Sequence, residues 1–100
     1  MAYFVVNASH RTPLPLPPNE VEAALPDHQA HIAKGLTDNR ILFAGPKSAG
    51  KGGFILMKAE TRQELDEYIA ADPFCQKGIM DYEITEFMPV DRQPYIEPWL

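Results

Sequence analysis

The most restrictive feature of this sequence is the order in which strand-like and helix-like segments follow one another. Four short segments are rich in β-branched, aromatic or alternating apolar residues, and two longer segments carry apolar residues at helical spacing. The predicted strands cover residues 2–7, 40–44, 54–59 and 80–88, and the predicted helices cover residues 26–38 and 62–71. The order is therefore strand, helix, strand, strand, helix, strand.

This order is the split βαβ pattern of ferredoxin-like α+β domains. It predicts one antiparallel sheet with both helices packed on the same face. The other face of such a sheet carries apolar side chains that must be covered, and a domain of only 100 residues buries a limited core. We therefore expect two copies to pack sheet against sheet as a homodimer.

Local signals predict where the helices begin and end. Asn19 has the character of an N-cap for a short helical piece at residues 20–25, and Pro26 then suits the first turn of the main helix. Asn39 is suited to the left-handed conformation that closes a helix. Thr61 begins a T-x-x-E capping box and is the predicted N-cap of the second helix.

Three segments are predicted to be irregular. Residues 8–19 contain a proline cluster, which predicts an extended loop that is either a connector or a lid. Residues 47–53 are glycine-rich and predict a hairpin turn, because no helix follows as a phosphate-binding loop requires. Residues 89–100 form a proline-punctuated apolar tail beyond the domain at residues 1–88, and we expect this tail to dock on its own domain or on the dimer partner.

Composition excludes several classes of function. The net charge is −5 and the basic residues are scattered, which argues against a nucleic-acid partner. The sequence has no apolar run of membrane-spanning length and no signal-peptide pattern, so a cytoplasmic protein without a membrane partner is expected. Cys75 is the only cysteine, and it cannot form a disulfide within the chain.

Two histidines on the main helix are the most unusual feature of the apolar pattern. His28 and His31 share one helical face with Ile32, Gly35 and Leu36, and this face is predicted to point inward. Histidine ionises near neutral pH, and a carboxylate partner can fix its tautomer and orientation for proton transfer. Asp72 follows the second helix, and neighbouring helices in a split βαβ layout can bring such residues together.

The spacing alone leaves two interpretations of these residues open. In the first, a histidine and Asp72 form a dyad that acts as a general acid or base. In the second, a buried histidine only satisfies its hydrogen bonds in the core while Asp72 caps a turn. A metal site is disfavoured because catalytic zinc needs three protein ligands and the sequence has no HExxH motif.

Other polar residues could contact a ligand in a pocket. Cys75 has no activating neighbour in the sequence, so an inert thiol is expected. The remaining candidates are Ser48 as a donor, Lys47 and Lys51 as attractors of an anion, and His10 and Arg11 in the loop that could close over a pocket.

From residue 2 to residue 87 the sequence resembles the YciI-like, or YCII-related, domain. The resemblance rests on YFVV, PDHQAHI, RILFAGP, AADPF and YEITEF in this order and spacing. It implies a dimeric ferredoxin-like fold, an α/β barrel formed by two subunits and similar to that of muconolactone isomerase. One departure is Leu25, because many relatives carry an arginine there.

The resemblance also implies a site. His28 and Asp72 match the active-site histidine and aspartate of the family, so they are the predicted catalytic dyad. The predicted substrate-binding residues are His31, Gly45, Pro46, Ser48 and Phe74. Some relatives are dehydrochlorinases, which implies a lyase or isomerase acting on a small anionic or enolisable molecule without a cofactor. The alternative is a non-enzymatic dimeric module that binds a metabolite.

Overall fold

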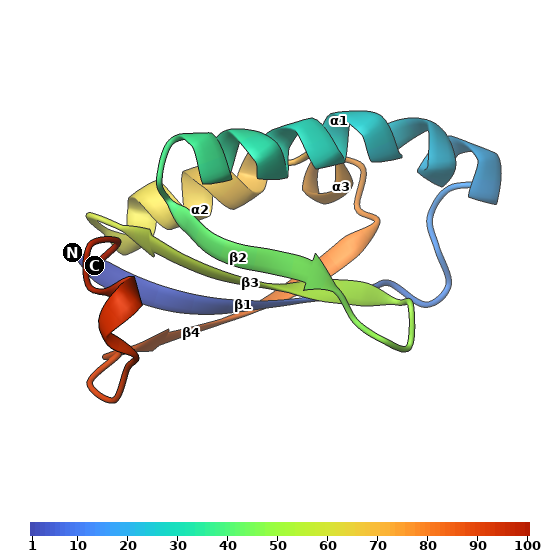
Figure 1. Cartoon of the computed structure of the whole chain (residues 1–100). Helices are drawn as coiled ribbons and strands as arrows, with labels where there is room; N and C mark the ends of the chain where they lie inside the picture. The colour runs from blue at the N-terminus through green and yellow to red at the C-terminus, as the bar shows by residue number, and fades with distance from the viewer.

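The computed structural model describes all residues from 1 to 100 and contains one four-stranded antiparallel sheet (Figure 1). The strands are β1 (Ala2–His10), β2 (Ile41–Pro46), β3 (Gly52–Ala59) and β4 (Met80–Phe87), in the spatial order β2-β3-β1-β4. The helices are α1 (Pro18–Thr37), α2 (Arg62–Ala70) and α3 (Pro73–Gln76), and a 3₁₀ turn, η1 (Pro94–Ile96), lies in the tail. The predicted ferredoxin-like α+β arrangement is confirmed, with all three α-helices on one face of the sheet. None of the helices combines the length and the apolar character needed to cross a membrane.

The central strand β1 pairs with β3 on one side and with β4 on the other. Its side chains alternate, so that Phe4, Val6 and Ala8 are buried against the helices. The prediction that the strand ends at residue 7 is wrong, because Ala8 pairs with Gly53 and His10 pairs with Met80. Pairing with β3 and β4 thus extends β1 through residues 8–10, which were predicted to belong to the loop.

Helix α1 is one continuous helix, and the predicted break before Pro26 is wrong. Pro26 lacks the N–H that would bond the preceding turn, but it lies on the exposed side. The helix is packed against the domain both before and after Pro26, through the buried residues Ala24 and Gly35. This packing outweighs the tendency of proline to end a helix. The predicted N-cap Asn19 lies inside the first turn, since the helix begins at Pro18.

Other helix signals have mixed outcomes. Asn39 has a φ of 62°, which confirms the left-handed residue after α1. The Thr61 side chain accepts a hydrogen bond from the Glu64 backbone N–H at 3.1 Å, so the predicted N-cap of α2 is confirmed. Leu36 is 48% exposed and does not belong to the inward face as predicted.

The hairpin of β2 and β3 is longer than predicted. Gly45 pairs with Phe54 and Pro46 pairs with Gly53, and β3 begins at Gly52, so the last two residues of the predicted turn at 47–53 belong to a strand. Pro46 is compatible with pairing because β2 is an edge strand, where a missing N–H removes no ladder bond. After α2, the predicted turn at residues 75–78 is replaced in part by the short helix α3.

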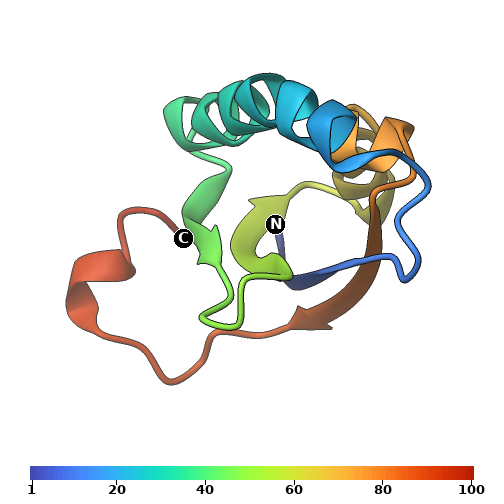
Figure 2. The same ribbon diagram turned by 90° about the vertical axis from the view of Figure 1, so that its right-hand side faces the viewer.

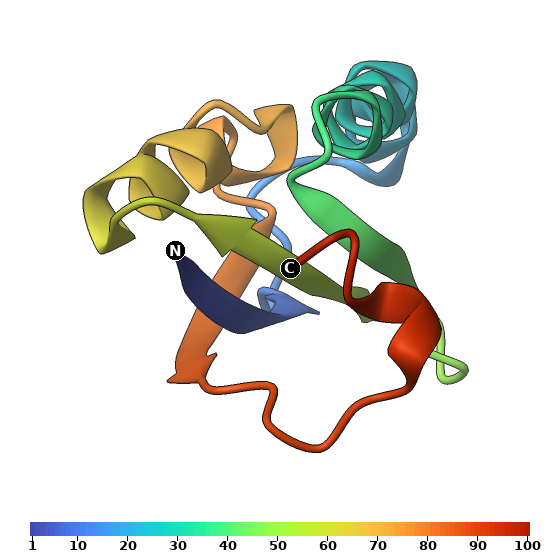
Figure 3. The ribbon, with the colours of Figure 1, turned by 60° about the vertical axis from the view of Figure 1, so that its left-hand side comes forward.

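The open face of the sheet carries apolar side chains and the C-terminal tail. Leu56 alternates with buried Ile55 and Met57, so it points away from the helices, and its cross-strand neighbour Phe43 is 60% exposed. Figures 2 and 3 show the tail running around this side, away from the helices.

The tail is held at the edge where the chain begins. Trp99 is only 8% exposed and lies with its ring centroid 5.8 Å from that of Tyr3. The Tyr3 hydroxyl donates to the Leu100 carbonyl at 2.8 Å, and the Lys58 ammonium group donates to the Trp99 carbonyl. The same ammonium group lies 5.0 Å from the centroid of the Trp99 ring. The division of the chain into a domain at residues 1–88 and a separate tail stays a prediction.

Close packing at Gly35 sets the position of α1. A Cβ atom at this position would lie 2.5 Å from Ile41 Cδ1 and 2.5 Å from the Tyr68 hydroxyl oxygen. That hydroxyl donates to the backbone carbonyl of His31 at 2.9 Å, which ties α2 to α1. The absence of a side chain at Gly35 therefore lets α1 approach both β2 and α2.

We predict that Gly35→Ala lowers the free energy of unfolding by about 1–3 kcal/mol, the usual range for overpacking a core. Alanine favours a helix over glycine by about 1 kcal/mol, so a gain in stability would contradict the close packing. Chemical denaturation measures the change. Gly45→Ala is the matched control, because a Cβ there meets no atom within 4 Å and its effect should be small.

We also predict that Tyr68 contributes to a loss of stability at alkaline pH. Burial, and secondarily the Asp72 charge, raises the pKa of Tyr68 from 10.0 to about 12. Between these values the unfolded chain has released the proton that the folded chain still holds, so the free energy of unfolding falls as the pH rises. Tyr68→Phe should be less stable at neutral pH by about 1 kcal/mol, through the lost hydrogen bond, but its stability should fall less steeply above about pH 10.

Denaturation curves recorded at increasing pH measure this slope. Tyr95→Phe is the control, since Tyr95 is 79% exposed and its loss should leave the alkaline slope of the wild type unchanged. Parallel slopes for Tyr68→Phe and the wild type would show that Tyr68 does not cause the alkaline loss.

Candidate active site

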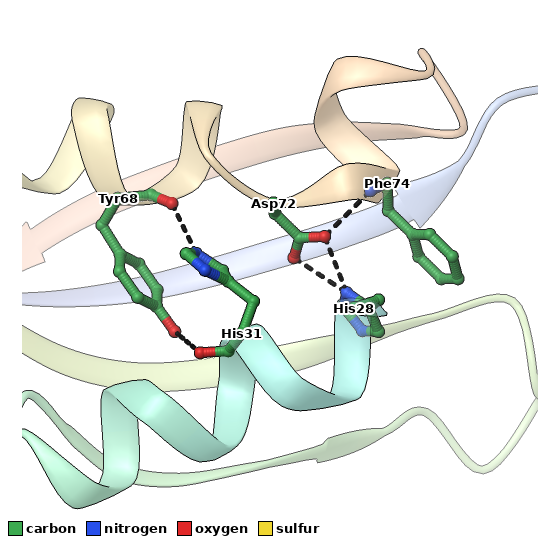
Figure 4. Close-up of polar contacts among 5 residues, drawn as sticks. All are labelled: His28, His31, Tyr68, Asp72 and Phe74. Atoms are coloured by element: carbon green, nitrogen blue, oxygen red, sulfur yellow. Dashed lines mark hydrogen bonds and ion pairs between the residues drawn. The ribbon is translucent and has the colours of Figure 1, made fainter. Parts of the chain in front are cut away.

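The structure brings His28 of α1 against Asp72, which lies between α2 and α3 (Figure 4). The His28 Nδ1 atom lies 2.9 Å from Oδ1 and 2.8 Å from Oδ2 of Asp72. The carboxylate side chain is 5% exposed and the imidazole 20% exposed. These two residues, 44 positions apart in the chain, therefore form a shielded pair between the middle of α1 and the junction of α2 and α3.

The backbone conformation at Asp72 explains why its carboxylate points toward His28. Asp72 precedes Pro73, which favours an extended conformation over a helical one, and it has a φ of −70° and a ψ of 128°. The residue thus ends α2 and becomes the N-cap of α3, where its Oδ1 atom accepts the Phe74 backbone N–H at 2.9 Å. A buried carboxylate is tolerated here because both of its oxygens have hydrogen-bond partners.

Phe74 holds the imidazole from the side. Its ring stacks on the ring of His28 with centroids 4.2 Å apart and planes only 2° from parallel. The carboxylate accepts from Nδ1, so the neutral imidazole of His28 carries its hydrogen on Nδ1 and a lone pair on Nε2. Nε2 makes no hydrogen bond within the chain, which leaves it available to accept a proton from a ligand.

His28 and Asp72 line a cavity of about 560 Å³ between α1 and the hairpin end of the sheet. This volume falls within the range of small-molecule sites. The predicted residues Gly45, Pro46 and Phe74 line the same cavity. Most of the wall is apolar. The small residues in the wall are Ala8, Ala44, Gly45, Gly50, Gly52 and Gly53.

Two of the predicted ligand-binding residues lie outside this cavity. The His31 ring stacks on Tyr68 with centroids 4.2 Å apart, and its Nε2–H donates to the Tyr68 carbonyl at 2.7 Å (Figure 4). His31 therefore faces α2, although His28 is only one helical turn away. Ser48 lies exposed in the hairpin turn and is not among the lining residues. The expected placement of both residues at the cavity is not met.

Two ionisable lining residues, Tyr82 and Glu22, are not among the site residues predicted from the sequence. Tyr82 of β4 points to the helical side of the sheet, and its hydroxyl is buried without a hydrogen-bond partner. Burial, followed by the Asp72 carboxylate, raises the pKa of Tyr82, so this hydroxyl stays protonated. Glu22 of α1 also lines the cavity. The strand alternation at residues 80–86 carried a signal for Tyr82, but nothing in the sequence marked Glu22.

The charges around the cavity limit what it can do. No lysine or arginine lines it, so His10 and His28 are the only lining side chains that can become positively charged. Burial, together with the Asp72 charge, raises the pKa of the Cys75 thiol, which disfavours the nucleophilic thiolate as expected. No group of three or more histidine, cysteine, aspartate or glutamate side chains has a geometry that could hold a metal ion.

No curated protein matches the chain. Among solved structures, the chain resembles 5-chloro-2-hydroxyhydroquinone dehydrochlorinase (TftG) from Burkholderia phenoliruptrix AC1100, in complex with 2,5-dihydroxybenzoquinone. The two share 22% sequence identity with a TM-score of 0.63, over 86% of this chain and 93% of the dehydrochlorinase chain, which is a likeness of fold. A model of the YCII-related domain matches residues 1–88. The chain therefore belongs to the YCII-related domain family.

Proposed function

We propose that the protein is a small-molecule enzyme of the lyase or isomerase type in which His28 and Asp72 act as a dyad for proton transfer. The observation that carries this proposal is the asymmetry of the His28 imidazole. Its Nδ1 atom is bound by a buried carboxylate, while its Nε2 atom has no partner and the residue lines a cavity. A histidine held in this way is suited to act as a general base.

The two residues of the dyad have different roles. Nε2 of His28 takes a proton from an acidic C–H or O–H group of the ligand. The carboxylate of Asp72 keeps the ring in one tautomer and stabilises the imidazolium that forms. Phe74 restricts rotation of the ring by stacking on it. The apolar wall excludes water and thereby strengthens the interaction between the two charges.

The cavity favours a compact ring compound as the ligand. Its volume and its apolar lining suit a ring, and Gly45 and Pro46 form part of the wall. The fold neighbour is a dehydrochlorinase of a hydroxylated aromatic ring, which supports the same class. Because no lysine or arginine lines the cavity, an anionic ligand depends on a protonated histidine for its charge partner.

The dyad is tested by an NMR titration of the histidine side chains in the wild type and in Asp72→Asn, with His28→Gln used for assignment. We expect the titration midpoint of His28 to move to lower pH in Asp72→Asn, because the imidazolium loses its anionic partner. His31 is the internal control, since its ring bonds to the Tyr68 carbonyl and not to Asp72. Identical titration midpoints for His28 in both proteins would contradict the dyad and would favour a non-enzymatic module that binds a metabolite.

We further propose that the protein is a homodimer built through the open face of the sheet. Phe43 and Leu56 are neighbours on this face, and Phe43 is largely exposed. Exposed apolar patches on a sheet of this size favour association. Because Trp99 and the tail cover only the end near Tyr3, the partner would meet both the sheet and the tail.

We predict that Phe43→Glu converts the dimer to a monomer, because a buried charge at the interface would lack a partner. Light scattering after size exclusion should give twice the chain mass of 11.2 kDa for the wild type and the single mass for the variant. Leu36→Glu is the matched control, since Leu36 is also an exposed apolar residue but lies on α1, on the helical side. A monomeric wild type, or dimers of both variants, would contradict this interface.

A further inference from the structure

A second histidine faces the cavity from the side opposite to His28. His10 is the last residue of β1 and lines the same cavity. Side chains of β1 alternate, so His10 points to the helical side together with Ala8, and its cross-strand neighbour Met80 is also a lining residue. His28 approaches from α1 above the sheet, and His10 approaches from the sheet itself.

The imidazole of His10 differs from those of the other two histidines because it has no hydrogen-bond partner within the chain. The other two histidines are bound within the chain, His28 by Asp72 and His31 by the Tyr68 carbonyl. The His10 side chain makes no hydrogen bond within the chain, and neither of its ring nitrogens is buried without a partner. Both nitrogens are therefore available to a ligand or to water. A structural histidine of a core would instead have its hydrogen bonds satisfied by the protein.

We propose that His10 is a catalytic residue that donates a proton to a ligand oxygen across the cavity from His28. This inference rests on the proposed function of the dyad. For an enolisable ring ketone the C–H bond next to the carbonyl breaks, and its proton goes to Nε2 of His28. The electron pair of that bond forms the C=C bond of the enol. The carbonyl π pair moves to oxygen, which takes a proton from the His10 imidazolium, so the total number of protons is unchanged.

Charged residues lie around the cavity and next to His10 on the neighbouring elements. Glu22 of α1 and Asp72 are the anionic residues among those that line the cavity. Next to His10, the Arg11 guanidinium is paired with Asp81 of β4 at 2.8 Å. On the hairpin, Lys51 accepts the His10 backbone N–H through its carbonyl, and the Lys47 ammonium group bonds to the Ser9 hydroxyl.

The test uses the full chain and 2,5-dihydroxybenzoquinone as the probe, because its ring carries oxygens at opposite edges. The imidazole ¹⁵N signals of all three histidines are recorded with and without the probe across a pH series. We expect the signals of both His10 and His28 to move on binding, while those of His31 stay unchanged. The titration midpoint of His10 should also move to higher pH in the complex, because the probe oxygen stabilises the imidazolium.

Two variants distinguish a direct contact between His10 and the probe from a merely structural role of His10. His10→Gln should weaken probe binding about tenfold or more, which is the usual effect of losing a hydrogen bond to a charged group. The variant should also reduce the loss of affinity that the wild type shows as the pH rises, because only His28 can then become positively charged in the cavity. Arg11→Gln is the control for a changed local charge, and it should bind the probe like the wild type.

The outcomes distinguish this inference from the proposed function. If the His28 signals move but those of His10 do not, the role of His10 is overturned and the dyad stands. If His10→Gln weakens binding equally at every pH, His10 is structural and the inference is likewise overturned. If neither histidine responds to the probe, both the inference and the proposed ring-compound ligand are wrong.

Discussion

The contact between the Asp72 carboxylate and Nδ1 of His28 is the constraint on which the site depends. It joins the middle of α1 to the point where α2 ends and α3 begins. A buried carboxylate is expensive unless every oxygen has a partner, and here the partners are an imidazole and the backbone N–H of Phe74. The same atoms that satisfy the charge also orient the ring. Structural stability and the chemistry proposed for His28 thus rest on one set of hydrogen bonds.

Small residues determine both where the helices come close and where the cavity opens. At Gly35 the lack of a side chain lets α1 approach Ile41 and Tyr68. At the other end of the sheet, Ala8 and Gly53 leave a gap beneath α1 because they carry little or no side chain. The layer between helix and sheet is therefore tight at one end and hollow at the other. The hollow end is where His10 and His28 are found.

The sequence predicts the order of the elements because each has a strong period or a local cap, as with Thr61 at the start of α2. It misses the continuity of α1 through Pro26, since the packing that overrides the proline comes from distant residues. It also misses the strand pairing of Gly53, whose close approach to the Gly45 carbonyl excludes a side chain. In such places tertiary contacts determine where a helix or strand begins and ends, and these contacts leave no local pattern in the sequence.

For the site, helical spacing places His28 and His31 on one face but does not decide which of them meets Asp72. The resemblance to the YCII-related domain identifies His28 in that role, and the structure brings His28 and Asp72 together. Nothing local in the sequence shows that His31 turns to α2, because that orientation depends on its stacking against Tyr68. The sequence predicts a loop at His10, because the proline cluster that follows hides the end of β1, whose alternation directs this side chain to the cavity.

The anchoring of Leu100 on Tyr3 has a consequence for how this domain could be joined to others. Both ends of the chain lie at the same edge of the molecule (Figure 1). The cavity lies at the far end of β1, near His10, which is about 23 Å away at the usual rise of a strand. A tag, a linker or a second domain attached at either terminus would leave from the edge remote from the cavity. The architecture therefore suits modular fusion, in which a neighbouring unit is added at the end of the sheet opposite the cavity.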